Sequence, residues 1–394
     1  MPGRIFFVGA GASRADSEDL PVPLPLAPEF FTTPYVTRHW SRGMWKRGAP
    51  FEESALAKIL QHYFGCSWSK SAGKLTLDCL INVEEVYSFI EICLQVYPAK
   101  FLFEREVFEQ GRRELLRYIV DVIRYVPWGL DRPKLHSTIV RNLKPEDSII
   151  TFNWDLLFDQ ALNRTKKGRV YLERQADLLN PFRTITTNQD RYEDVAQADL
   201  HKGQFLKLHG SINLAICEKP DCALAAVPYR FGLRDEMLEG WPCRACGSPL
   251  EVMIIPPYVH KSYLSSRFSR VQASIAVNKI SMAEEITIIG YSMPVFDFHA
   301  RTLMRLARMS LEERGLGEML DLERLVIVNP QISDVAYLNR VTELFGIDHA
   351  ADVYGAGVEL VRYGTIDEYL AKELSPKRRK RKTASKKPAR SKPK

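Results

Sequence analysis

Short apolar runs that end in small or polar residues recur along the chain, and they constrain its fold more than any other feature. They lie at residues 4–13, 148–155, 205–211, 285–292 and 325–330, with a further one expected within 353–364. Several are apolar throughout, which is typical of parallel strands covered on both faces. Between them lie helix-like segments, at residues 155–163, 263–280, 297–313 and 333–345. This alternation predicts an α/β fold with a Rossmann-like, doubly wound parallel sheet.

Two stretches interrupt the alternation of strands and helices. Residues from about 50 to 145 have the sequence of nearly continuous helix, and residues from about 214 to 256 contain four of the seven cysteines. We expect both to be insertions that build a smaller domain beside the sheet. The whole chain is therefore predicted to be one domain over residues 1–375, followed by a tail.

The tail, residues 376–394, contains eleven lysines and arginines and no acidic residue. Removing its charge from the net charge of +7 leaves −4 for residues 1–375. Because the tail has no large apolar side chain to bury, it is predicted to be disordered. Two roles fit it equally: a solvated extension, or nonspecific attraction to nucleic acid through counterion release. Salt-sensitive nucleic-acid binding that disappears when 376–394 is deleted would identify the second.

The sequence favours a cytoplasmic protein with no membrane partner. No apolar run reaches the length of a transmembrane helix, and the N-terminus lacks the apolar region of a signal peptide. Three cysteines, Cys66, Cys79 and Cys93, are scattered through helix-like sequence and are expected to be core thiols.

The other four cysteines have the spacing of a metal site. Cys217 and Cys222 form one pair, and Cys243 and Cys246 form a second pair twenty residues further on. Four clustered thiols in a cytosolic protein predict a zinc ribbon with tetrahedral coordination. Since four thiolates leave no open coordination position, the zinc is expected to be structural.

The turn after the first strand contains Gly9, Ala10, Gly11 and Ser13. Two glycines at this place would let the backbone approach a pyrophosphate. The full dinucleotide fingerprint is not completed, because Arg14 occupies the place of its third glycine. A bare tight turn is therefore nearly as good an explanation.

Polar residues also follow the second and third expected strands, where open α/β sheets bind ligands. Asn153 and Asp155 end the run at 148–155, although an asparagine there could simply cap the next helix. His209 ends the apolar part of the run at 205–211. It could be a core histidine, a metal ligand beside Cys217, or a catalytic base.

The last two strand ends carry further polar residues. Gly290 and Ser292 follow one strand and Asn329 follows the next, as suits donors to phosphate and ribose hydroxyls. Asp297 could anchor a loop or cap the following helix.

Taken in order, GAG-x-S, T-x-N-x-D, LHGS, the four cysteines, G-x-S and VNP resemble the sirtuin superfamily, the NAD-consuming silent-information-regulator fold, over residues 4 to about 330. The resemblance implies a Rossmann-like domain, a small domain of helical insertion and zinc ribbon, and NAD between them. It implies cofactor-binding roles for Gly9, Ala10, Gly11, Ser13, Gly290, Ser292 and Asn329. It implies catalytic roles for Asn153, Asp155 and His209.

The sequence departs from the protein-deacylating members of that superfamily. LPVPLP at 20–25 stands in place of their Gly-Ile-Pro-x-Phe-Arg segment, and MIIPPYVHKSYL at 253–264 stands in place of a Phe-Gly-Glu segment that pairs with the acyl-lysine peptide. The chain thus resembles divergent sirtuin-like domains of prokaryotic proteins, several of which hydrolyse NAD in antiphage defence. We expect the NAD machinery to be retained and the peptide machinery lost.

The predicted function is an NAD⁺ hydrolase that releases nicotinamide and ADP-ribose, as an antiphage effector controlled by an activating partner or by homo-oligomer formation. Asn153 and Asp155 would orient the carboxamide, the ribose and water, and His209 would accept a proton from a ribose hydroxyl or the water. The alternatives are an NAD-dependent protein-lysine deacylase, and a catalytically silent NAD or ADP-ribose-binding module tethered to nucleic acid by its tail.

Overall fold

A computed structural model describes most of the chain. The described residues are 3–42, 51–71, 74–78, 81–96, 103–125, 133–179, 202–217, 219, 221–222, 229–230, 241–255, 267–294, 297–313, 322–345 and 358–374. The tail 376–394, residues 256–266 and Cys79 lie outside them.

The central element is a six-stranded, fully parallel sheet with the order β11-β10-β9-β1-β4-β5. Counted along the chain, this order is 3-2-1-4-5-6, that of a doubly wound Rossmann-like fold. The α/β fold predicted from the apolar runs is confirmed, and each run contains one strand of this sheet. The strands are β1 (Arg4–Val8), β4 (Ser148–Thr151), β5 (Phe205–Lys207), β9 (Glu285–Ile289), β10 (Arg324–Val328) and β11 (Glu359–Tyr363).

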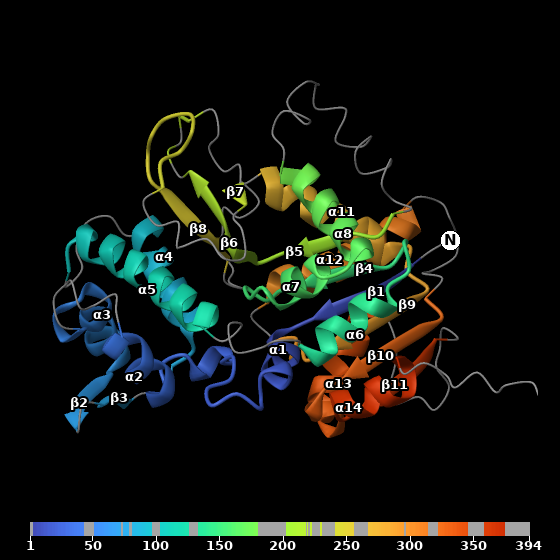
Figure 1. Cartoon of the computed structure of the whole chain (residues 1–394), viewed down its shortest axis with the longest axis horizontal. Helices are drawn as coiled ribbons and strands as arrows, with labels where there is room; N and C mark the ends of the chain where they lie inside the picture. Colours follow the sequence, from blue (N-terminus) through green and yellow to red (C-terminus); the bar gives the residue numbers. More distant parts are fainter. Residues whose placement is uncertain are drawn as a thin grey trace, which may run out of the picture.

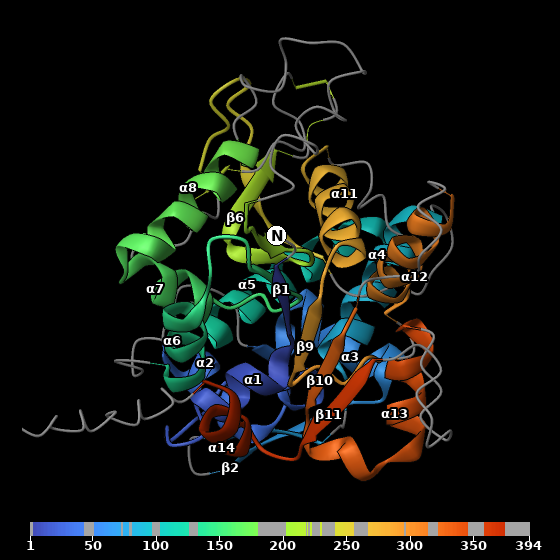
Figure 2. The same ribbon diagram turned by 90° about the vertical axis from the view of Figure 1, so that its right-hand side faces the viewer.

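Helices cover both faces of this sheet, which explains why its strands are apolar throughout (Figure 2). Ile5 and Phe7 of β1 belong to one core cluster, and Phe6 and Val8 belong to the cluster on the opposite face. The first face is covered by α11 (Arg267–Ser281), α12 (Phe298–Glu313) and α13 (Val335–Thr342). The second is covered by α1 (Ala10–Asp16), α6 (Lys134–Asn142), α7 (Leu157–Asn163), α8 (Lys166–Leu179) and α14 (Ile366–Tyr369).

The first insertion forms its own helical unit at one end of the sheet (Figure 1). From the expected insertion at about 50–145 it contains α3 (Ala55–Phe64), α4 (Val83–Val96) and α5 (Arg105–Tyr125). The unit also includes the preceding α2 (Thr33–Arg42), whereas α6 packs on the main sheet. It also contains an antiparallel hairpin, β2 (Ser67–Ser71) and β3 (Lys74–Asp78), where nearly continuous helix was expected. Gly65 ends α3 with a φ of 66°, and Trp68 then pairs with the buried Leu77 across the hairpin. The alternation of apolar and polar residues in these short strands is the signal that the helical interpretation overlooked.

The second insertion is a three-stranded antiparallel sheet that continues directly from β5. Its order is β7-β6-β8, with β6 (Gly210–Cys217), β7 (Tyr229–Arg230) and β8 (Leu250–Ile254). The chain leaves the main sheet at Gly210, which has a φ of 74°. A Cβ at this position would lie 2.0 Å from the carbonyl oxygen of Met253, so only glycine fits. The run at 205–211 is therefore two strands of two different sheets, with His209 in the turn between them.

The expectation of core thiols holds for Cys93, which is buried and free, and is wrong for Cys66, which is buried but disulfide-bonded. The spacing of single cysteines in sequence carries no information on such a pairing, because it depends on which segments fold side by side. Within the described part of the chain, we find no helix whose length and hydropathy would allow it to span a membrane.

A buried lysine on β5 connects the main sheet to the loop that follows β4. The Lys207 ammonium donates to the carbonyl oxygen of Asp155 at 2.8 Å, to the carboxylate of Asp159 at 2.8 Å, and to the Ser211 hydroxyl. Lys207 and Asp159 are each 1% exposed. Asn213 donates to the other oxygen of Asp159 at 3.1 Å. All polar atoms of this ion pair are therefore engaged inside the protein.

We expect Lys207→Met to lower the free energy of unfolding by about 3–5 kcal/mol, because the Asp159 carboxylate would remain buried without its counter-charge. The measurement is urea unfolding of the variant and the wild type at pH 7. Lys58→Met on the exposed face of α3 is the matched control and should change stability little. A loss below about 1 kcal/mol for Lys207→Met would contradict this account of the ion pair.

Candidate functional site

A cleft opens at the carboxyl ends of β1 and β4, between the sheet and the helical insertion. The sheet side contributes Ala10, Ser13, Phe152, Asn153, Trp154 and Asp155. The other side contributes Leu24, Pro25, Ala27 and Phe30, together with Glu84 of α4 and Ile123 of α5. The LPVPLP segment, which departs from the sirtuin pattern, thus forms part of the wall.

Ser13, Asn153 and Asp155 form a hydrogen-bonded cluster in this cleft. The Ser13 hydroxyl donates to Oδ2 of Asp155 at 2.7 Å, and Nδ2 of Asn153 donates to the Ser13 hydroxyl at 2.9 Å and to the carbonyl oxygen of Gly9 at 3.0 Å. Because a carbonyl can only accept, the Gly9 contact fixes which way the Asn153 amide faces. The carbonyl oxygen of that amide is then the atom with which Asn153 can bind a ligand.

Asp155 also supports the start of the next helix. Its Oδ1 accepts from the backbone N–H of Leu157, the first residue of α7, at 2.9 Å. The helix-start role considered for Asn153 is therefore carried by Asp155, while Asn153 lies in the cleft. Both oxygens of the Asp155 carboxylate have donors within the protein.

The glycines after β1 and β9 allow the two strand ends to approach closely. The N–H of Gly11 donates to the carbonyl of Gly290 at 2.8 Å, and Gly290 has a φ of 59°. A Cβ at Gly290 would lie 2.1 Å from the nitrogen of Ala12, and one at Gly9 would lie 2.6 Å from Cα of Tyr291. This packing at the reversal of strand order accounts for the glycines by itself, so their contact with a pyrophosphate stays a prediction. Ala10, by contrast, is exposed to the cleft.

His209 lies beside the cleft, not in its lining. It is 3% exposed, and its ring meets the ring of Phe152 edge-on with centroids 4.9 Å apart. Phe152 itself lines the cleft, so His209 contacts the cleft wall through this ring. Nε2 of His209 is 3.6 Å from Oδ1 of Asp297, and among the described residues it has no hydrogen-bond partner. Of the three alternatives for this residue, the metal ligand is not supported, because the metal site has four other ligands.

Asp297 has the helix-capping role that was one of its two alternatives. It accepts from the backbone N–H of Ala300 in the first turn of α12 at 3.0 Å, and it accepts from the Tyr291 hydroxyl. Burial alone would raise its pKa, but the charge of His209 and the hydrogen bonds from Tyr291 and Ala300 lower the pKa below its usual value. Asp297 is therefore an ionised partner for the His209 imidazole.

Ser292 and Asn329 lie outside the cleft. Ser292 is exposed. Asn329 is buried, accepts from the N–H of Gln331 at 2.9 Å and donates to the carbonyl of Tyr291 at 3.2 Å. These contacts give Asn329 a structural role, and its role toward a ribose stays a prediction.

Glu84 is the cleft residue that the sequence analysis missed. It lies in the first turn of α4, where its N–H donates to Oδ1 of Asn82 at 2.8 Å. Burial raises the pKa of its carboxyl group to about 7, a change that the charge of His209 opposes and that of Asp297 reinforces. An asparagine followed by acidic residues is the common start of any helix, so the sequence around Glu84 gave no sign of the cleft.

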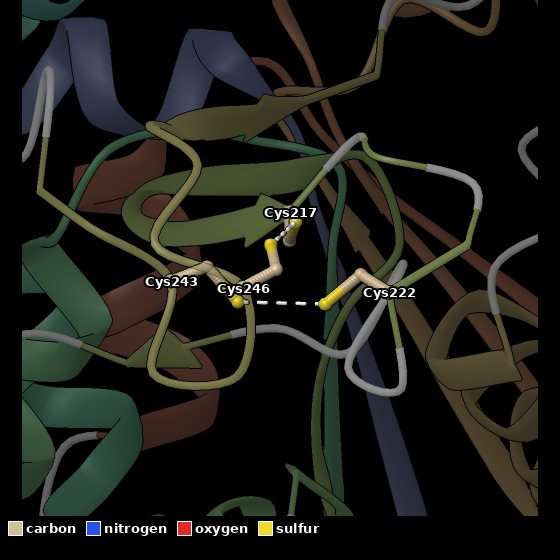
Figure 3. A group of neighbouring side chains, drawn as sticks. All are labelled: Cys217, Cys222, Cys243 and Cys246. Atoms are coloured by element: carbon tan, nitrogen blue, oxygen red, sulfur yellow. Dashed lines mark hydrogen bonds between the residues drawn. The ribbon is translucent and has the colours of Figure 1, made fainter.

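The four clustered cysteines converge from two loops of the second insertion (Figure 3). Their sulfur atoms all lie within 4.8 Å of one another, with Cys217–Cys246 and Cys222–Cys243 each 3.6 Å apart. Tetrahedral zinc with Zn–S bonds of about 2.3 Å separates its sulfurs by about 3.8 Å, so the four thiols fit one zinc ion. Among the residues of this insertion that the structure describes, the apolar cluster around them adds only Ala215 and Leu250. So small a core needs the metal for its stability.

Comparison with known proteins finds no matching family model and no matching curated protein. A solved structure of Sir2 with the inhibitor EX-527, 2′-O-acetyl-ADP-ribose and a deacetylated p53 peptide is 13% identical, covering 94% of this chain and 93% of its own, with a TM-score of 0.35. A mutant Sir2 homologue bound to ADP-ribose is 13% identical, covering 83% of this chain and 80% of its own, with a TM-score of 0.34. The fold assignment above rests on the strand order and pairing of this chain.

We expect the purified protein to contain about one zinc ion per chain, and Cys222→Ser to lose most of it, because three thiolates bind zinc far more weakly than four. The measurement is elemental analysis, with limited proteolysis of residues 214–256 as a second readout. Cys93→Ala, which removes a free thiol on α4, should keep the metal. A wild-type protein that folds and resists proteolysis after complete chelation of zinc would contradict a structural role.

Proposed function

We propose that this protein hydrolyses NAD⁺ between nicotinamide and ribose, giving nicotinamide and ADP-ribose. The observation that carries the proposal is the Ser13–Asn153–Asp155 cluster in a cleft at the carboxyl edge of a 3-2-1-4-5-6 sheet. In folds of this type, dinucleotides bind at the carboxyl edge, beside the reversal of strand order. The motif resemblance to sirtuins assigns the same three residues to NAD.

The charge of the cleft suits this reaction. The nicotinamide of NAD⁺ is a cationic ring that leaves as a neutral molecule, so bond cleavage needs little acid assistance. Water then adds to the ribose carbon and loses one proton, which balances the reaction as NAD⁺ and water giving nicotinamide, ADP-ribose and H⁺. Among the described residues that line the cleft, Glu84 and Asp155 are acidic and none is basic. Such a lining favours positive charge developing on the ribose.

Asn153 is proposed to orient the water or a ribose hydroxyl through its carbonyl oxygen. Its amide nitrogen is held by Gly9 and Ser13, so this oxygen has a fixed position before the substrate arrives. Groups fixed in advance lower the barrier because they need no reorganisation during the reaction.

His209 is proposed to accept a proton from a ribose hydroxyl at the edge of the cleft. Support comes from its buried imidazole, from Nε2 without a hydrogen-bond partner among the described residues, and from the ionised Asp297 beside it. Because His209 contacts the cleft wall through Phe152 and does not line the cleft itself, the histidine is proposed to act on the ribose side and not on the nicotinamide ring. The cellular role in antiphage defence is part of the proposal and rests on the sequence resemblance alone.

We expect purified protein to release nicotinamide from NAD⁺ without any peptide, and His209→Ala to reduce the rate by about 10²–10⁴-fold, as for loss of a general base. Asn153→Ala should also reduce kcat strongly, because it removes a positioned acceptor. The measurement is chromatographic quantification of nicotinamide. His62→Ala and Asn142→Ala, at exposed positions on α3 and α6, are the matched controls and should retain full activity.

The same assay with an acetyl-lysine peptide separates the alternatives. Nicotinamide release that requires the peptide would contradict the hydrolase and identify the protein as a deacylase. NAD binding without release, at all protein concentrations tested, would contradict hydrolysis and favour the silent binding module.

A further inference from the structure

We propose that Glu84 makes the cleft selective for a positively charged aromatic ring, with its carboxylate as the counter-charge. This deepens the proposed function, since the cationic ring would be the nicotinamide end of NAD⁺. It predicts that the cleft distinguishes the oxidised, cationic pyridinium from a neutral ring of nearly the same shape.

The backbone around Glu84 is held firmly at the cleft. The Glu84 N–H is bound by Asn82, and its carbonyl oxygen accepts from the Ser88 hydroxyl at 2.7 Å. One turn further along α4, the Tyr87 hydroxyl donates to the carbonyl of Ile254 on β8 at 3.2 Å. The side chain is half-buried, and among the described residues none donates a hydrogen bond to its carboxylate. The carboxylate is thus positioned at the cleft and available to a ligand.

The walls around this carboxylate are aromatic. Phe30, Phe152 and Trp154 all line the cleft, and the Phe30 and Trp154 rings meet edge-on with centroids 6.4 Å apart. Aromatic faces attract cations, most strongly where water is excluded. The indole N–H of Trp154 is buried and without a partner among the described residues, as at a site that a ligand completes.

Of the two carboxylates that line the cleft, Glu84 is the one to which no described residue donates a hydrogen bond, although the charge of His209 acts on it from a distance. Asp155 also lines it, but Ser13 and Leu157 donate to both of its oxygens. On the neighbouring 3-10 turn Ala27–Glu29, Glu29 pairs with Arg14 at 2.7 Å. The counter-charge for a bound cation therefore has to come from Glu84.

The groups that influence the ionisation of Glu84 lie on three other segments: His209 after β5, Tyr291 after β9, and Asp297 before α12. On α5, which packs against α4, Arg112 is paired with Glu91 and with Glu251. With its pKa raised to about 7, the Glu84 carboxyl is neutral in acid and charged above neutrality. Its charged fraction rises from about a tenth at pH 6 to about nine tenths at pH 8.

The test compares 1-methylnicotinamide, a cation, with neutral nicotinamide. Neither has a glycosidic bond, so their binding is measured independently of any hydrolysis. Dissociation constants are obtained by NMR titration of the full-length protein at pH 6 and pH 8. We expect the wild type to bind 1-methylnicotinamide about tenfold more tightly at pH 8 than at pH 6, and to bind nicotinamide equally at both.

Glu84→Gln should abolish the pH dependence and weaken binding of the cation, while binding of nicotinamide changes little. Glu85→Gln is the matched control, because Glu85 is exposed on the same turn of α4 and should behave as wild type.

Folding of Glu84→Gln is checked by its Tm. Because folding raises the pKa of Glu84 from its usual 4.5 to about 7, the free energy of unfolding of the wild type falls as the pH rises from 4.5 to about 7. The variant lacks this loss and should have the higher Tm at pH 8.

Three results would overturn the proposal: pH-independent binding of 1-methylnicotinamide by the wild type, a pH dependence that persists in Glu84→Gln, or no binding of 1-methylnicotinamide at pH 8. Hydrolysis of NAD⁺ combined with any of these would reject the role of Glu84 and keep the hydrolase. Cation-selective binding without hydrolysis would keep the role of Glu84 and reject the hydrolase.

Discussion

The rest of the site depends on one buried ammonium group, that of Lys207. Burying a charge costs several kcal/mol unless it is paired and hydrogen-bonded, and Lys207 meets both requirements through Asp159 and the carbonyl of Asp155. Because Lys207 comes from β5 and Asp159 from α7, the pair clamps the β4–α7 loop onto the sheet. The Lys207–Asp159 ion pair, whose two side chains do not line the cleft, thus helps to position Asn153.

The polar groups of this site that have hydrogen-bond partners within the protein differ in role from those that have none. Ser13 and Asp155 have their hydrogen bonds filled within the protein, which suits them to hold a geometry. The Glu84 carboxylate and Nε2 of His209 have no hydrogen-bond partner among the described residues. Polar groups without a partner in or beside a cleft are suited to contact a ligand, as proposed here for Glu84 and His209.

Much of this architecture could be predicted from sequence, because apolar runs and cysteine spacing are local signals. The six parallel strands and the four converging cysteines were predicted and confirmed. The β2–β3 hairpin was missed because its alternation of apolar and polar residues is confined to two five-residue strands within a stretch that otherwise has helical periodicity. Glu84 was missed because its importance arises from packing of α4 against strand ends far away in sequence. The packing of His209 against Phe152, which keeps the histidine out of the cleft lining, is likewise a product of three-dimensional packing, invisible in the order of motifs.

The turn at Gly210 has a mechanical consequence. His209 immediately precedes the residue at which the chain passes from the parallel sheet to the antiparallel one, and β6 continues from there to Cys217. The turn is tied down on both sides, because the N–H of Ile255 donates to the carbonyl of His209 at 2.9 Å and the N–H of Ile212 donates to the carbonyl of Trp154 at 3.0 Å. The imidazole is therefore held between the core of the protein and the strand that ends at the metal site, so the order of the metal ribbon bears directly on the position of the histidine.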